Sequence, residues 1–144
     1  MGLKQDNTRV VLTTPFGKDE LWAVKFFGEE SLSGLFHFTV EAASAKPNLD
    51  FTKVLGKNVT LTLKDPQKKE RLIDGVVTRF MQGPTDKRVT SYIMELRPWF
   101  WMLTLTSDSR IFQEKKTTEI IEACFKEAGF TDFKNQCQGT YKPR

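Results

Sequence analysis

RLIDGVVTRFMQGPTDKRVTSYIMEL, residues 71–96, carries the clearest strand pattern in the chain. Tyr92, Met94 and Leu96 occupy alternate positions, and a period of two is typical of a strand with one buried face. Gly75 marks a bulge in the first half or the close approach of another backbone. Two long strands joined by a short loop form an antiparallel hairpin. The predicted elements are strands over residues 71–81 and 88–96 and a turn over residues 83–87.

Shorter stretches before this hairpin show related patterns. Phe36, Phe38 and Val40 alternate with more polar residues, and Val59 and Leu61 do the same further along. Turn signals separate these stretches, and about seven short strands at such spacing indicate a sandwich or barrel of mainly antiparallel strands. The further strands are predicted over residues 8–13, 21–27, 34–42 and 57–64.

One short helical turn is predicted between two of these strands. Asp50 can cap its start and Gly56 can end it. Phe51, Val54 and Leu55 are then expected to form its buried side.

The pattern changes to a helical period near the end of the chain. Thr117 or Thr118 provides an N-cap, and Gly129 followed by Phe130 is a typical C-terminal signal. The fold class expected is therefore mainly β with a minor α part, an antiparallel β-barrel or sandwich followed by one C-terminal α-helix. The apolar positions at helical spacing are Ile120, Ile121, Cys124, Phe125 and Ala128.

The composition is that of an ordered domain with a mild basic excess. The chain has 144 residues, 39% of them apolar, and a formal net charge of +4. The nearest approach to a basic cluster is Lys64, Lys68, Lys69 and Arg71, and acidic residues interrupt it. A solvated hairpin loop is favoured there over a phosphate-binding patch. We expect no signal peptide and no membrane span, because the first residues are polar and no long apolar run follows.

The search for reactive groups finds no assembled motif. His37 is the only histidine, and neither it nor Cys124 and Cys137 has the spacing of a metal site. The cysteines are expected to be free, as in a reducing compartment. Asp74 and Glu95 lie on paired strands and could form a carboxylate pair, although solvated strand faces carry such residues routinely. Without a phosphate-binding loop or a nucleophile elbow, no catalytic residue, cofactor or metal is predicted.

The segment RPWFWMLTLTSDSRIFQE, residues 97–114, concentrates aromatic side chains. In an extended chain, Trp99 and Trp101 point to one face while Phe100 and Met102 point to the other. A strand buried on both sides, or an edge segment between a barrel and a second element, has this pattern. Stacking on nucleic-acid bases needs exposed aromatics among basic residues, and only Arg97 is close, so packing is favoured. An oligomer interface is the third alternative.

Five segments, in this order, carry a resemblance to a known family. They are EESLSGLFHF (29–38), LGKNVTL (55–61), GVVT (75–78), LRPWFWML (96–103) and SRIFQ (109–113). With them, the chain resembles the VgrG family, the spike proteins of the bacterial type VI secretion system, in its N-terminal region, which is similar to phage baseplate hubs. The resemblance extends from about Val10 to Tyr141.

The resemblance implies a mechanical role. Members of the family resemble the phage tail-tube and hub fold, assemble as homotrimers, dock on the ring of the Hcp tube, and carry secreted effectors or adaptors. Assembly in the cytoplasm followed by export through the secretion system is implied, and no catalytic residue is expected. Family members run on through the rest of the hub to a β-helical needle, so the chain is expected to be a fragment or a truncated product.

The resemblance also suggests a division of the chain and a role for the aromatic segment. Residues 1–106 are expected to form the β-barrel hub domain, and residues 107–144 the truncated start of a second α/β hub domain. A structural junction between the two is predicted from Trp99, Trp101, Arg110 and Phe112.

Three other functions stay open at this point. A phage tail baseplate hub protein would obey the same physics as the spike. A small basic β-barrel that binds nucleic acid is suggested by the pI of about 9.1, although the resemblance implies no nucleic-acid partner. An enzyme built on strand carboxylates is the third, and it has no motif to support it.

Overall fold

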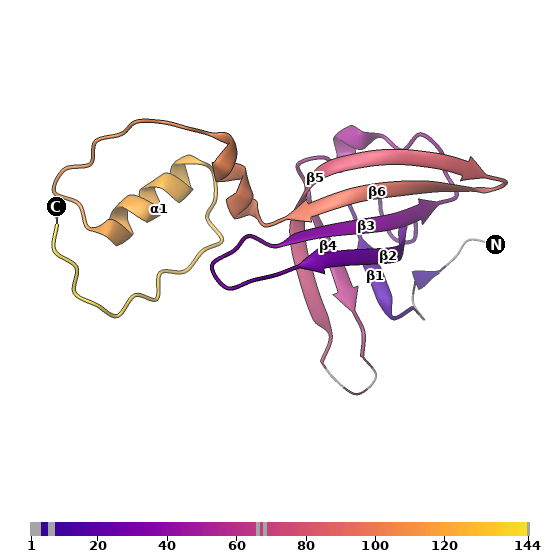
Figure 1. Ribbon diagram of the computed structural model, residues 1–144, viewed down its shortest axis with the longest axis horizontal. Helices are drawn as coiled ribbons and strands as arrows, with labels where there is room; N and C mark the ends of the chain where they lie inside the picture. Colours follow the sequence, from indigo (N-terminus) through magenta and orange to yellow (C-terminus); the bar gives the residue numbers. More distant parts are fainter. Residues whose placement is uncertain (1–3, 6–7, 66, 68, 144) are drawn as a thin grey trace. The chain divides into compact units, whose positions relative to one another are not determined.

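In the described part of the chain, six antiparallel strands form one sheet whose order is β1-β4-β5-β6-β3-β2. The computed structural model describes residues 4–5, 8–65, 67 and 69–143. The end strands β1 and β2 lie next to each other, so the sheet curls into a nearly closed barrel (Figure 1). The strands are β1 (Val10–Thr13), β2 (Trp22–Glu29), β3 (His37–Ser44), β4 (Asn58–Leu63), β5 (Arg71–Asp86) and β6 (Val89–Arg97).

The chain divides into two units, Met1–Trp101 and Met102–Arg144. The first holds the barrel, and its core lies on the inner face of the sheet. Tyr92, Met94 and Leu96 are at most 1% exposed, as their alternation in the sequence predicts. The buried core residues are Leu12, Leu21, Phe38, Val40, Ala42, Val54, Val59, Leu61, Ile73, Val77, Tyr92, Met94 and Leu96.

The central hairpin is confirmed, but its turn is shorter than predicted. β5 continues to Asp86, and β6 resumes at Val89, opposite Asp86. A register shift between Gln82 and Thr85 absorbs Pro84, which has no backbone N–H to offer the ladder. The glycine and proline of residues 83–87 therefore belong to a bulge in β5, and the turn itself consists of residues 87–88.

The short helical turn between β3 and β4 is η2 (Phe51–Lys53), a 3₁₀ helix. Asp50 caps it as predicted, since its Oδ1 accepts the Thr52 N–H at 3.0 Å. The predicted buried side is wrong in two of three positions: Val54 is buried, but Phe51 is 59% and Leu55 44% exposed. A single 3₁₀ turn is too short to bury a whole face.

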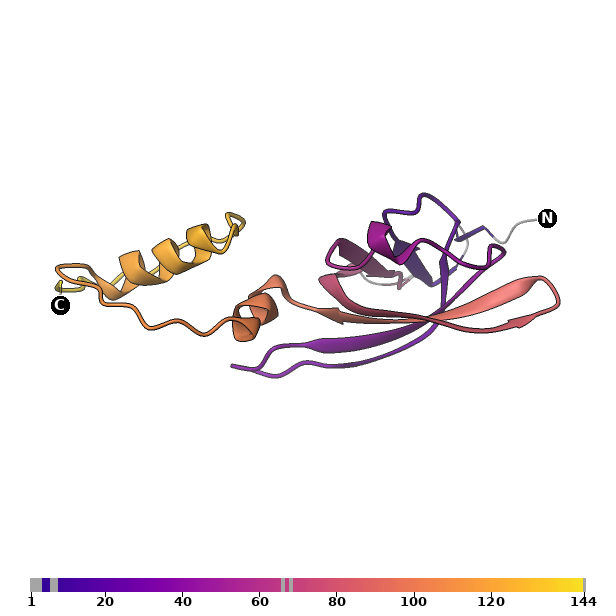
Figure 2. The same ribbon diagram turned by 90° about the horizontal axis from the view of Figure 1, so that it is seen from above.

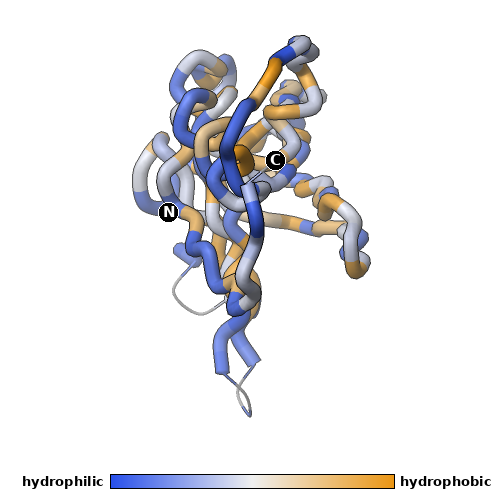
Figure 3. The backbone as a smooth tube through the Cα atoms, turned by 90° about the vertical axis from the view of Figure 1, so that its left-hand side faces the viewer, coloured by the Kyte–Doolittle hydropathy of each residue, from blue (hydrophilic) through white to orange (hydrophobic). Residues whose placement is uncertain are grey.

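The loop between β4 and β5 lies at a hydrophilic end of the hairpin that these strands form (Figure 3). The Asp65 Oδ1 accepts the Gln67 N–H at 3.0 Å, which matches a turn. This composition agrees with a solvated loop. Pro66 of this loop and Lys68 of the basic run lie outside the described residues.

The aromatic segment is helical and not extended as predicted. η3 (Trp99–Leu105) is a 3₁₀ helix in which none of the seven residues is buried. The Trp101 N–H donates to the Pro98 C=O at 2.9 Å, which closes the first turn. Proline suits that position because its missing N–H is not needed there and its φ is already helical.

The single α-helix of the described part is α1 (Thr117–Glu127). Its N-cap is Lys116 and not a threonine, and the Lys116 N–H donates to the Glu119 Oε2 at 2.8 Å. The C-terminal signal is confirmed: Gly129 has a φ of 85°, and the Phe130 N–H donates to the Phe125 C=O at 2.9 Å. Figure 2 shows α1 between the irregular segments that precede and follow it in the chain.

In the described part of the second unit, residues 102–143, no residue is buried. Phe125 and Phe133 make an edge-to-face contact with ring centroids 5.1 Å apart. Throughout the residues that the structure describes, no helix has the length and apolarity needed to cross a membrane.

Candidate functional site

A charged cluster lies on the polar face of three neighbouring strands, centred on Glu95 of β6. The Glu95 Oε1 accepts a hydrogen bond from Arg79 Nη1 at 3.3 Å. The Glu95 Oε2 lies 3.4 Å from His37 Nε2 and 3.8 Å from Arg97 Nη2. Glu95 is only 21% exposed, so these three basic groups surround a carboxylate that solvent reaches poorly.

Arg97 of this cluster also contacts the aromatic segment. The Arg97 guanidinium lies over the Trp101 ring, with 5.1 Å between the guanidinium carbon and the ring centroid. Trp99 contacts Phe100 edge to face at 5.8 Å. Cation–π contacts contribute about 0.5–1 kcal/mol at exposed sites, so Arg97 connects the carboxylate of Glu95 to the ring of Trp101 with a small stabilising energy.

Arg110 in the second unit connects the loop before α1 to the end of that helix. Its Nε donates to Asp108 Oδ2 at 2.8 Å, and its Nη1 pairs with Glu127. The hydrogen bond from Arg110, followed by its charge, lowers the pKa of Asp108. The hydrogen bond to Asp108 and the charge of Glu127 raise the pKa of Arg110. Phe112 packs beside the Lys115 ammonium, 5.9 Å from its ring centroid.

The four residues predicted to form a junction therefore lie in two units. Trp99 and Trp101 end the first, and Arg110 and Phe112 belong to the second. Each pair has contacts within its own unit. That the four form one structural junction stays a prediction. The predicted burial of the tryptophans is not what the structure has, because both are only half-buried.

The two strand carboxylates are not brought together. Asp74 accepts from Asn58 Nδ2 at 2.9 Å and from Thr60 Oγ1 at 2.7 Å, both on β4. Glu95 faces β3 and β5 instead. These side-chain bonds hold neighbouring strands in register, and they give Asp74 a structural use. Within the described ranges, no three His, Cys, Asp or Glu side chains gather as they would around a metal ion. Both cysteines are free, as predicted.

One residue that the sequence did not single out lies at the seam between β1 and β2. Gln5 is 4% exposed and its side chain bonds to the backbone on both sides of the seam. No pattern in the sequence indicates its burial, because a single glutamine in a polar segment is usually exposed.

The chain matches the family described as phage tail baseplate hub (GPD) over residues 29–144, and it belongs to this family. The resemblance found in the sequence is thereby confirmed.

Named relatives lie among type VI secretion spike proteins. The chain is 38% identical over 141 residues to the spike protein VgrG1c of Pseudomonas aeruginosa, covering 97% of this chain and 19% of the relative. It is 33% identical over 126 residues to the spike protein VgrG3 of Vibrio cholerae, covering 81% of this chain and 12% of the relative. The chain thus spans less than a fifth of these relatives.

The fold agrees with a solved structure. The E. coli c3393 protein, described as a type VI secretion component with structural similarity to the T4 tail proteins gp27 and gp5, superposes with a TM-score of 0.69. The match covers 96% of this chain and 36% of that one at 19% identity. The predicted fold class, an antiparallel β-barrel followed by one helix, is confirmed.

Proposed function

We propose that this chain is a hub module of a type VI secretion spike, which assembles as a homotrimer and docks on the Hcp tube during contractile injection. The observation that carries the proposal is the 38% identity to a VgrG spike protein over 97% of the chain. The role is mechanical: the barrel transmits force, and the spike carries effectors or adaptors out of the cell in which it assembles.

The geometry of the described residues supports a mechanical part. Glu95 and Asp74 each bond across strands to basic or polar partners, which stiffens the sheet. A module that transmits force needs such cross-strand connections more than it needs a cleft.

We further propose that residues 107–144 begin a second α/β hub domain. No described side chain between residues 102 and 143 is buried, although α1 presents an apolar side. Helices gain most of their stability from packing such a side against other parts of a protein. In the proposal, Trp99, Trp101, Arg110 and Phe112 connect the barrel to this second domain.

The first experiment is the solution mass by light scattering coupled to size exclusion, across a range of concentrations. A trimer of the 16.6 kDa chain supports self-association through this module. A monomer at all concentrations contradicts it for this module. Trp101→Ala and Arg110→Glu are expected to weaken trimers, with Lys134→Ala in the second unit as a control. A trimer unchanged by both variants contradicts the role of the junction.

Docking on the tube needs a separate test. Purified Hcp rings are expected to sediment together with the trimer, and trimers that leave the rings unbound would contradict docking. A phage tail baseplate hub is the second candidate, favoured by the family description. It predicts binding to a phage tail-tube protein in the same assay and none to Hcp.

A further inference from the structure

Two side chains of the amino-terminal segment, those of Gln5 and Thr8, cover the outer edge of β1. β1 pairs with β4 along one edge. On the other edge, the Leu12 N–H and C=O both bond to the Gln5 side chain. The Val10 C=O, also on that edge, accepts from Thr8 Oγ1 at 2.7 Å. Side chains from residues 5 and 8 thus take the places that a neighbouring strand would fill.

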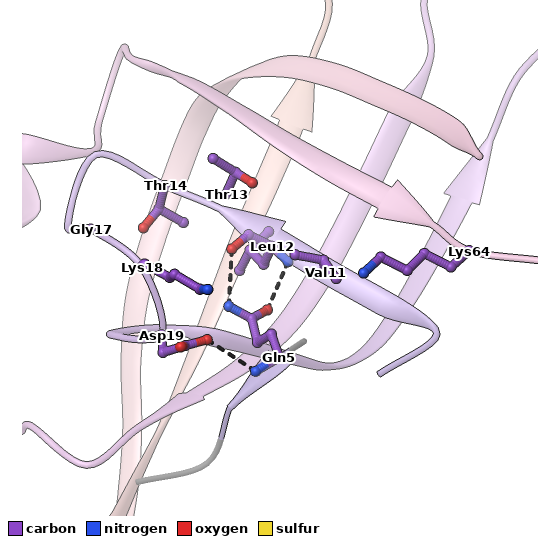
Figure 4. A pocket seen from close by; sticks show the side chains of 9 residues that line it. All are labelled: Gln5, Val11, Leu12, Thr13, Thr14, Gly17, Lys18, Asp19 and Lys64. Carbon is purple, nitrogen blue, oxygen red and sulfur yellow. Dashed lines mark hydrogen bonds between the residues drawn. The ribbon is translucent and has the colours of Figure 1, made fainter. Parts of the chain in front are cut away.

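The Gln5 carboxamide acts like a peptide group of an added strand. Its Oε1 accepts the Leu12 N–H at 2.8 Å, and its Nε2 donates to the Leu12 C=O at 3.2 Å. The second Nε2 hydrogen reaches the C=O of Leu21, the residue before β2, at 3.3 Å. Figure 4 shows the side chain entering beneath β1. One amide therefore connects the two ends of the sheet.

The segment holds this side chain in place through its own backbone. The Gln5 N–H donates to Asp19 Oδ1 at 3.0 Å, and the Gln5 C=O accepts from the Thr8 N–H at 3.1 Å. Gln5 lies only 7 positions before Leu12, so bringing its side chain to β1 costs little conformational entropy. The arrangement is preorganised and local.

The seam has space that Gln5 does not fill. A cavity of about 490 Å³ lies along the edge, and its lining includes Gln5, Thr13 and Lys64. An unpaired strand edge is a template for pairing with another chain, and proteins commonly cover such edges. Only side-chain groups cover this edge in the described part of the chain, since β1 is an end strand there and its backbone pairs with β4 and not with β2.

We propose that the amino-terminal segment is a strap that locks the barrel seam through Gln5 and keeps the edge of β1 from pairing with another strand. Release of Gln5 exposes three backbone groups on β1 and before β2 at once. The strap therefore governs whether the sheet ends at β1 or accepts a strand from a second copy of the chain.

Amide hydrogen exchange of Leu12 tests the lock directly. Gln5→Met keeps the length of the side chain but removes its amide, and it is expected to speed exchange of the Leu12 N–H about ten-fold or more, because the bond it loses is buried. Amides between β4 and β5 should keep their rates. Unchanged exchange at Leu12, or equal acceleration at every amide, overturns the proposal.

Variants of Asp19 provide the control and a milder perturbation. Asp19→Asn keeps an acceptor for the Gln5 N–H and is expected to leave Leu12 exchange unchanged. Asp19→Ala removes it and should accelerate Leu12 less than Gln5→Met does. If Gln5→Met does not fold, Asp19→Ala carries the test. The released edge should also raise the concentration-dependent mass of Gln5→Met above that of the wild type, and an equal mass at all concentrations overturns the protective role.

Discussion

Gly28 of β2 faces Phe38 of β3 across the sheet, and replacing it with alanine should show how tightly the barrel is packed. An added Cβ would overlap the Phe38 ring. That ring is 5% exposed and contacts Phe36 edge to face at 5.7 Å, so it has little room to turn away. Overpacking of a core costs about 1–3 kcal/mol.

Urea unfolding of Gly28→Ala measures this cost, and we expect a loss of about 2 kcal/mol within the range for overpacked cores. For a domain of about 100 residues, the size of the unit Met1–Trp101, each kcal/mol of lost stability lowers Tm by roughly 4–8 °C. The far-ultraviolet spectrum at low urea should match the wild type, which separates a packing defect from a failure to form the sheet.

A double-mutant cycle supplies the control. Phe38→Leu removes the ring and leaves space for the new methyl group, so Gly28→Ala should cost much less in that background. The coupling expected for residues in contact is about 0.5–3 kcal/mol. If the two losses add to within about 0.5 kcal/mol, the clash with Phe38 is not the cause and the reasoning is refuted.

Three further predictions concern single contacts. Tyr92→Phe removes the hydroxyl that donates to the Lys46 C=O at 2.8 Å; we expect a loss of about 1–3 kcal/mol in urea unfolding, and an unchanged midpoint would contradict it. Arg110→Gln should raise the pKa of Asp108 toward its usual value of 3.8, followed by NMR titration. Because that pKa is lowered in the folded chain, the contact stabilises at pH above 3.8 and is lost as pH falls through the lowered value; a pKa insensitive to Arg110 argues against it. Gly129→Ala places a side chain at a φ of 85°, so helix content by circular dichroism should fall, at a cost of about 1–2 kcal/mol, and equal helix content would refute the strain.

Periodic local patterns were enough to predict most of the barrel. The alternation of Tyr92, Met94 and Leu96 placed β6 and its buried face correctly, since a half-buried strand must repeat every two residues. The end of α1 was equally readable, because Gly129 can adopt a positive φ without strain. For the aromatic segment the same kind of pattern gave a wrong prediction. Its side chains suit both faces of a strand, but the residues after Pro98 form a 3₁₀ helix.

The candidate site was harder to predict than the fold. Glu95 and Arg97 were visible as charged strand residues, yet their partners on β3 and β5 depend on strand order and register. Asp74 and Glu95 looked like a pair because their strands are neighbours, and they separate because the register places Arg79 opposite Glu95.

The order of residues along the chain therefore settled which segments are strands, which face of each is buried, where the helix stops and which family the chain resembles. The strands, their buried faces and the helix end depend on neighbours a few positions away, and the resemblance depends on short segments in a fixed order. Tertiary structure alone decided how the sheet closes. β1 and β2 are the two end strands of the sheet, and Gln5 bonds to both Leu12 and Leu21 only because the sheet curls and brings these ends together. A hydrogen bond between residues that the chain brings together from different elements leaves no periodic trace in the sequence.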